Sequence, residues 1–233
     1  MIIKFKNFTE GLGIPYDSDM EKYKEEKYGE HINKEIVIDA SKDKIPPEEV
    51  AYLLIRDCKP IIKELRKLKN KIIPLKGLNN VYYNYAKCKS QLDYRPPLDM
   101  WGWHHDIFND VFEGLFGWKV RNGVLTYMCP SNKHTTGYGD NDYIFLPIGD
   151  YDYVYSTDIS DLFSEVEDGY MNVEDEDELR GLIEHGDFTD DNLNYFDRDD
   201  HIKGRSEISW GCKEYYLFDE ETYRDVIEKI IWR

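Results

Sequence analysis

The chain has 233 residues, 41% of them hydrophobic, so it can bury the core of one good-sized domain or two small ones. No stretch approaches the ~20 apolar residues of a membrane span, and the N-terminus is too short and polar for a signal peptide, which predicts a cytosolic protein. The formal net charge of -17 disfavours generic binding of nucleic acid, because a field of that sign repels phosphate.

The first half of the chain is expected to contain an N-terminal extension and two helices. Residues 1–45 predict a short strand followed by long loops. From Pro46, apolar residues at steps of three and four predict an amphipathic helix that Pro60 should kink. The stretch "KIIPLKGL" predicts a buried strand. After Pro97 a second apolar stripe predicts a helix that begins at an Asp99 cap and ends at Gly117.

The second half is expected to be rich in strands. "VRNGVLTYM" and "DYIFLPIGDYDYVYS" predict strands, and Asn122-Gly123 is a tight-turn signal. "TDISDLF" and "EDEDELRGLIEHG" predict short helices, the second ending at Gly186. A strand at 204–218 and a helix at 219–233 complete the chain. We therefore predict one α+β domain with an antiparallel sheet and with helices mainly in the N-terminal half.

The acidity is concentrated in one segment. Residues 158–200 contain 17 Asp and Glu against two Arg, which gives a net charge of -15, so the rest of the chain is only about -2. One interpretation is a solvated acidic insertion, and the other is an acidic surface that binds a basic partner.

Metal and covalent chemistry have little support in the sequence. The four cysteines form no CxxC pair, so neither a zinc knuckle nor a disulfide framework is predicted. Asp140 with Asp142 and the acidic run at 174–178 lack the frame of a calcium loop. The adjacent His104 and His105 point about 100° apart on a helix, which favours core or rim histidines over metal ligands.

Three short stretches are the remaining candidates for chemistry: "PLKG" at 74–77, "GVLTY" at 123–127 and "SEISW" at 206–210. Their order, with "IRDCKPIIKEL", "RPPLD", "FGWKVRNGV", "YGDNDYIFLPIGDYDYVYS" and "DISDL", resembles bacteriophage-encoded ADP-ribosyltransferase-like proteins. The resemblance extends from about Ile55 to Phe218. It implies a split antiparallel β core at 46–218 with 158–200 as an acidic insertion.

The resemblance implies NAD as the substrate and assigns a role to each matching residue. Lys76, before Gly77, takes the place of an arginine that grips the phosphates or ribose, and Thr126 the central hydroxyl of the nicotinamide pocket. Glu207 takes the catalytic place at the start of a late strand. Arg95 and Arg121 are further candidates for phosphate contact, and Tyr143 or Phe145 for a ring against nicotinamide. These are the predicted cofactor and catalytic residues, and no metal is predicted.

Three departures from that pattern bear on activity. Lys76 lacks the bidentate fork of arginine. The hydroxyl motif is Leu125-Thr126-Tyr127, so only its centre matches, and Arg205 stands where a second acidic residue would precede Glu207. Three functions therefore remain open. The first is transfer of ADP-ribose from NAD to a host macromolecule or nucleotide in the host cytoplasm. The second is a degenerate fold that inhibits a host factor through its acidic surface, and the third is a virion or structural-interaction protein.

Overall fold

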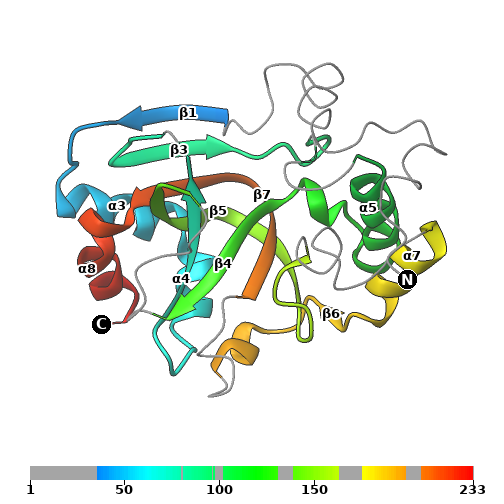
Figure 1. Cartoon of the computed structure of the whole chain (residues 1–233). Helices are drawn as coiled ribbons and strands as arrows, with labels where there is room; N and C mark the ends of the chain where they lie inside the picture. Colours follow the sequence, from blue (N-terminus) through cyan, green and yellow to red (C-terminus); the bar gives the residue numbers. More distant parts are fainter. Residues whose placement is uncertain are drawn as a thin grey trace.

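The computed structural model describes residues 36–79, 81–95, 97, 102–130, 139–162, 175–197 and 206–232. Helices are combined with one antiparallel seven-stranded sheet, which confirms the predicted α+β class (Figure 1). In chain order the elements are β1 (Ile36–Ser41), α3 (Pro47–Asp57), α4 (Lys59–Leu65), β2 (Ile72–Leu78), β3 (Tyr85–Lys89), α5 (Gly102–Phe116), the 3-10 helix η3 (Val120–Asn122), β4 (Val124–Pro130), β5 (Asn141–Ser156), α7 (Glu176–His185), β6 (Phe188–Thr189), the 3-10 helix η4 (Leu193–Asp197), β7 (Ser206–Asp219) and α8 (Glu220–Ile231).

Four of the strands close into a small barrel. β2 pairs with both β4 and β5, and β7 also pairs with both, so the order β2–β4–β7–β5 returns to β2. The length of β7 allows this closure. Its first residues pair with β4 and its last with β3, while β5 lies along its other edge. β3 and β1 extend the sheet beyond the barrel, and β6 pairs with the end of β5.

The register of β4 and β7 decides which side chains point into the barrel. Thr126 lies opposite Ile208 and Val124 opposite Trp210, so these side chains share one face. The other face of β7 is covered from outside, since Ser209 Oγ donates a 2.6 Å hydrogen bond to a carbonyl of η3. The fully buried Trp210 therefore faces the interior of the barrel.

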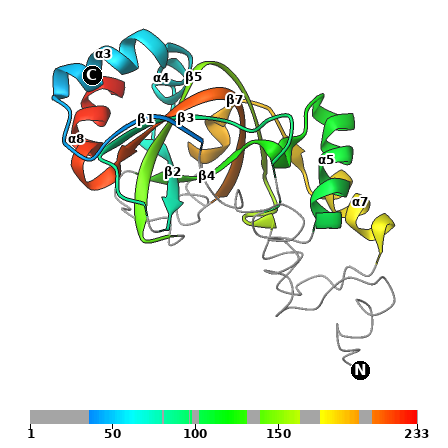
Figure 2. The same cartoon turned by 90° about the horizontal axis from the view of Figure 1, so that it is seen from above.

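Helices cover the sheet in two groups on opposite sides (Figure 2). α3, α4 and α8 pack beside the main core, and α5 packs with α7 over a second, smaller core. Val154 of β5, Phe112 of α5 and Leu179 of α7 belong to that smaller core. Three of the described α-helices lie before residue 117 and two after residue 175. None of these helices combines the length and apolar character needed to cross a membrane.

Two elements have boundaries that differ from the predicted ones. The helix expected across Pro60 is two helices, because the chain leaves helical geometry at Cys58 (φ -109°, ψ 21°) and Pro60 occupies the first turn of α4, where its missing N–H costs nothing. The prediction of a strand at 120–128 was wrong for its first residues, because residues 120–122 form η3 and β4 begins at Val124. Gly123 has a φ of -67°, and a Cβ there would lie 2.8 Å from Ser209 Oγ, so close packing of β7 requires this glycine.

β1 was missed by the sequence analysis, which assigned this stretch to loops. The strand forms one edge of the sheet beside β3 and has five exposed residues among its six. A strand exposed on both faces shows no alternation of apolar and polar residues. The predicted strand at the very N-terminus and the Asp99 cap lie outside the described residues. The short helix predicted at "TDISDLF" was wrong over residues 157–161, which are bends and coil, and only Leu162 is helical. The Asp158 and Ile159 N–H groups bind Ser156 Oγ there, and the Ser160 carbonyl accepts the Glu207 N–H, so this backbone bonds outside a helix.

The two C-terminal helices and β7 confirm their predictions. The Asp175 side chain caps α7 by accepting the Glu178 N–H at 3.0 Å, and the helix stops before Gly186. The Asp219 side chain caps α8 by accepting the Thr222 N–H at 2.8 Å. Clear capping residues and one buried face made these helices predictable.

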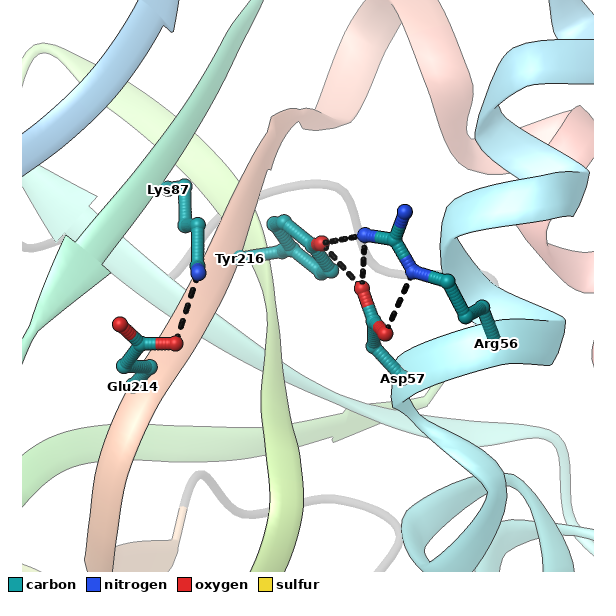
Figure 3. Close-up of polar contacts among 5 residues, drawn as sticks. All are labelled: Arg56, Asp57, Lys87, Glu214 and Tyr216. Carbon is teal, nitrogen blue, oxygen red and sulfur yellow. Dashed lines mark hydrogen bonds and ion pairs between the residues drawn. The ribbon is translucent and has the colours of Figure 1, made fainter.

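A polar cluster ties α3 to β7 (Figure 3). The Tyr216 hydroxyl donates to Asp57 Oδ2 at 2.5 Å, and Arg56 donates to Asp57 Oδ1 at 2.7 Å and to Oδ2 at 2.5 Å. The hydrogen bonds from Arg56 lower the pKa of Asp57, and burial raises the pKa of Tyr216. Lys87 and Glu214 form a separate ion pair on the neighbouring strands at 2.7 Å.

We expect the Asp57 carboxylate to make stability depend on pH in acid. Its pKa is lowered in the folded protein, so its contribution is full at neutral pH and is lost as the pH falls below about 4 toward the folded pKa. The free energy of unfolding of Asp57→Asn should therefore fall less between about pH 5 and about pH 2 than that of the wild type. Urea denaturation checks this, with Asp225→Asn on the exposed side of α8 as the control. Parallel curves for wild type and Asp57→Asn would contradict the assignment.

Candidate functional site

A buried ion pair joins the start of β7 to η3. Arg121 Nη1 donates to Glu207 Oε1 at 2.9 Å, and the two side chains are 3% and 12% exposed. A charge-assisted hydrogen bond removed from water is stronger and more fixed than one at the surface. Of the predicted site residues, these two are brought into direct contact.

A network of amide side chains fixes the backbone that carries Arg121. Asn109 Oδ1 of α5 accepts the Arg121 N–H at 2.9 Å, and Asn109 Nδ2 donates to Asn122 Oδ1 at 3.0 Å. His105 Nε2 lies 3.2 Å from the same Asn122 oxygen, and Asn122 Nδ2 donates to the Leu92 carbonyl at 3.0 Å. Because all three side chains are buried, η3 is held from α5 and from the preceding loop.

Sequence reasoning missed this network. His105 and Asn109 are four residues apart and so lie on one face of α5, which is the signal that the sequence does contain. Asn122 was interpreted only as part of a turn. Its partners are 13 and 17 residues earlier, a separation that no local pattern reports.

A narrow cavity lies beside the Glu207–Arg121 pair. Its volume for water-sized molecules is about 20 Å³, and its polar lining comes from Glu207, Arg121, Ser156 and Ser209. Phe112 and other apolar side chains from the smaller core form the rest of the wall. This is room for roughly one or two water molecules, since each needs about 10–15 Å³ on this measure.

Thr126 does not join Glu207 in this cavity. Its side chain is fully buried, and its hydroxyl accepts a hydrogen bond from Trp210 Nε1 at 2.8 Å. Glu207 is paired with Tyr127, the neighbour of Thr126 in β4, so the side chains of Thr126 and Glu207 lie on opposite faces of the sheet. Thr126 therefore contacts the barrel interior.

Lys76 and Gly77 lie on β2, on the far side of β4 from β7. Lys76 is 6% exposed, and its Nζ donates to the Leu125 carbonyl of β4 at 3.3 Å. Gly77 is paired with Asp142 of β5. The ammonium group of Lys76 is thus largely enclosed by the barrel strands.

The side chains of Tyr143 and Arg95 each donate a hydrogen bond to a backbone carbonyl. Tyr143 is paired with Lys76 across β2 and β5, and its hydroxyl donates to the Val81 carbonyl at 3.1 Å. Burial raises the pKa of Tyr143. Arg95 Nη1 donates to the Gly123 carbonyl at 2.5 Å, which places this arginine beside the junction of η3 and β4. Arg205 lies outside the described residues.

These features define an α+β protein with a closed four-stranded barrel and a buried carboxylate–guanidinium pair at its edge. No family model matches the chain, and no curated protein or solved structure matches it.

Proposed function

We propose that the chain is an ADP-ribosyltransferase-like phage protein that takes ADP-ribose from NAD and transfers it to a host macromolecule or nucleotide in the host cytoplasm. The observation that carries this proposal is the Glu207 carboxylate, held in place by Arg121 beside a cavity. When nicotinamide leaves, the ribose carbon acquires positive charge. A fixed carboxylate facing that carbon stabilises the transition state more than the substrate.

The arrangement of strands supports the same proposal. Lys76, Thr126 and Glu207 lie on β2, β4 and β7, which are consecutive neighbours in the barrel. We propose that this barrel corresponds to the split antiparallel core that the resemblance implies for 46–218. Because the cavity at Glu207 is small, NAD binding requires the smaller core to move away from β7.

Thermal unfolding with and without NAD tests the proposal. NAD should raise the melting temperature of the wild type, because a ligand that binds the folded state stabilises it by about 2.7 kcal/mol at a hundred times its Kd. Glu207→Gln should show a smaller rise. Glu214→Gln is the matched control, since it changes a second ion-paired glutamate of β7 far from the cavity. No rise for the wild type, or equal rises for all three proteins, would contradict the proposal.

A second candidate function is binding of a basic host factor by a fold without catalysis. Thr126 is already bonded to Trp210 and the cavity beside Glu207 is narrow, which favours this candidate. The acidic surface that it requires is formed by exposed carboxylates of α5 and α7, which pack against each other: Asp106, Asp110, Glu113, Glu176, Asp177 and Glu184.

Arg180 of α7 lies among these carboxylates. Its guanidinium donates to Glu176 Oε1 at 2.7 and 2.9 Å. The pKa of Arg180 is raised first by this hydrogen bond, and also by the charges of Asp110 of α5 and Glu184.

Pull-down from host lysate at low and high salt tests whether the acidic surface binds a partner. Capture through this acidic surface weakens as salt rises, because screening shortens the range of exposed charges to about 3 Å at 1 M.

A further inference from the structure

A second, partly open cavity lies at η3. It is lined by the loop before residue 96, by α5 and by Lys119 and Asn122 at the two ends of η3, and its volume is about 150 Å³. This is room for roughly ten water molecules, whereas the cavity beside Glu207 holds one or two. Its lining is Asp93, Tyr94, His105, Asp106, Asn109, Asp110, Lys119 and Asn122.

The floor of this cavity is polar and fixed. His105, Asn109 and Asn122 are 4%, 5% and 3% exposed, and the hydrogen bonds among them hold their side chains in one arrangement. These groups already bond one another, so the floor is a fixed polar surface, against which an apolar ligand gains little from burial. The cavity therefore suits a ligand with hydrogen-bonding groups.

The wall of the cavity is acidic. Asp93, Asp106 and Asp110 are opposed by Lys119, so the lining has a formal charge of -2 with histidine neutral. Tyr94, which is 57% exposed, adds an aromatic residue to the lining. Carboxylates together with a ring face are the groups that attract a planar guanidinium cation.

We propose that this cavity binds the guanidinium group of an arginine side chain on a partner protein. The planar guanidinium has five N–H donors, which match several carboxylates at once, and lysine is the weaker ligand of the same class. The surrounding acidic surface of α5 and α7 draws a basic segment toward the opening. This binding site is separate from the Glu207–Arg121 pair and does not depend on turnover of NAD.

A pair of nearly isosteric probes tests the proposal on the full chain. N-acetyl-arginine amide and N-acetyl-citrulline amide differ chiefly in charge and are titrated separately by isothermal calorimetry or by NMR. We expect the arginine probe to bind at least about tenfold more tightly than the citrulline probe, since loss of a charge-assisted contact of about 1.4 kcal/mol is a tenfold change. Equal binding of the two probes, or binding of neither, would overturn the proposal.

Matched variants locate the binding. Asp110→Asn and Asp106→Asn should each weaken the arginine probe several-fold, whereas Glu113→Gln changes an exposed carboxylate on α5 outside the cavity and should leave it unchanged. Glu207→Gln should also leave it unchanged, so failure here is distinguishable from failure of the NAD proposal. Circular dichroism confirms that each variant is folded. Unchanged affinity in both aspartate variants would overturn the assignment to this cavity.

Discussion

Glu207→Leu is expected to lower the free energy of unfolding by about 3–5 kcal/mol, because it removes one partner of a buried ion pair. The reason is Arg121, whose side chain is 3% exposed and is left charged without Glu207. Taking a guanidinium out of water costs free energy that its ion partner offsets. Glu207→Gln keeps an oxygen that accepts from Arg121 and should cost less, which is why this variant is used in the activity tests.

The double variant separates this explanation from simple loss of packing. When Arg121→Met accompanies Glu207→Leu, no charge remains buried, and stability should recover much of the loss. Urea denaturation of the two single variants and the double variant gives the coupling energy directly. If the losses of the single variants simply add, then the two side chains do not stabilise each other and the ion pair contributes nothing.

Trp210→Ala is the second change with a large expected effect, a loss of about 3–5 kcal/mol. Trp210 is fully buried in the barrel and contacts the rings of Phe145, Tyr151 and Tyr153. Its removal leaves a cavity where strands β4, β5 and β7 meet, and close-packed strands cannot fully collapse into it. Tyr52→Ala is the control, because Tyr52 is 60% exposed and its loss should be nearly neutral.

Substitutions of Thr126 test the hydrogen bond from Trp210 Nε1 separately from the packing of the Trp210 ring. Thr126→Val keeps the shape of the side chain but leaves Trp210 Nε1–H buried without its acceptor, at a cost of about 1–3 kcal/mol. Thr126→Ser keeps the hydroxyl and should cost less. Urea denaturation of the two variants and the wild type compares their free energies of unfolding. A valine variant as stable as the wild type would show that Thr126 is not needed as a structural acceptor.

Elements with one buried face were predictable from sequence, and elements without one were not. α7 and α8 each show the periodicity of a half-buried helix, and both begin at side-chain caps. β1 is exposed on both faces and shows no pattern. Closure of the barrel depends on pairings distant in sequence and on a bulge in β5 between Ile148 and Tyr151, which local reasoning does not detect.

The candidate site was predictable residue by residue but not as an arrangement. Arg121 and Glu207 were both predicted, yet they are 86 residues apart, and their contact depends on the 3-10 turn at η3. Thr126 was predicted to share the site. A shift of one residue in strand register moves a side chain to the opposite face, and the pairing of Thr126 with Ile208 turns it inward.

Transfer of label from NAD most directly tests the proposal that Glu207 stabilises the transition state of ADP-ribose transfer. Wild type, Glu207→Gln and Glu214→Gln are incubated with NAD labelled in its ADP-ribose part and with host lysate, and labelled products are separated. We expect labelled products with the wild type and with Glu214→Gln. The rate should fall by about 10²–10³ with Glu207→Gln, as for removal of one fixed group that stabilises a transition state. Equal labelling by Glu207→Gln and wild type, or no labelling by any of the three proteins, would contradict this role of Glu207.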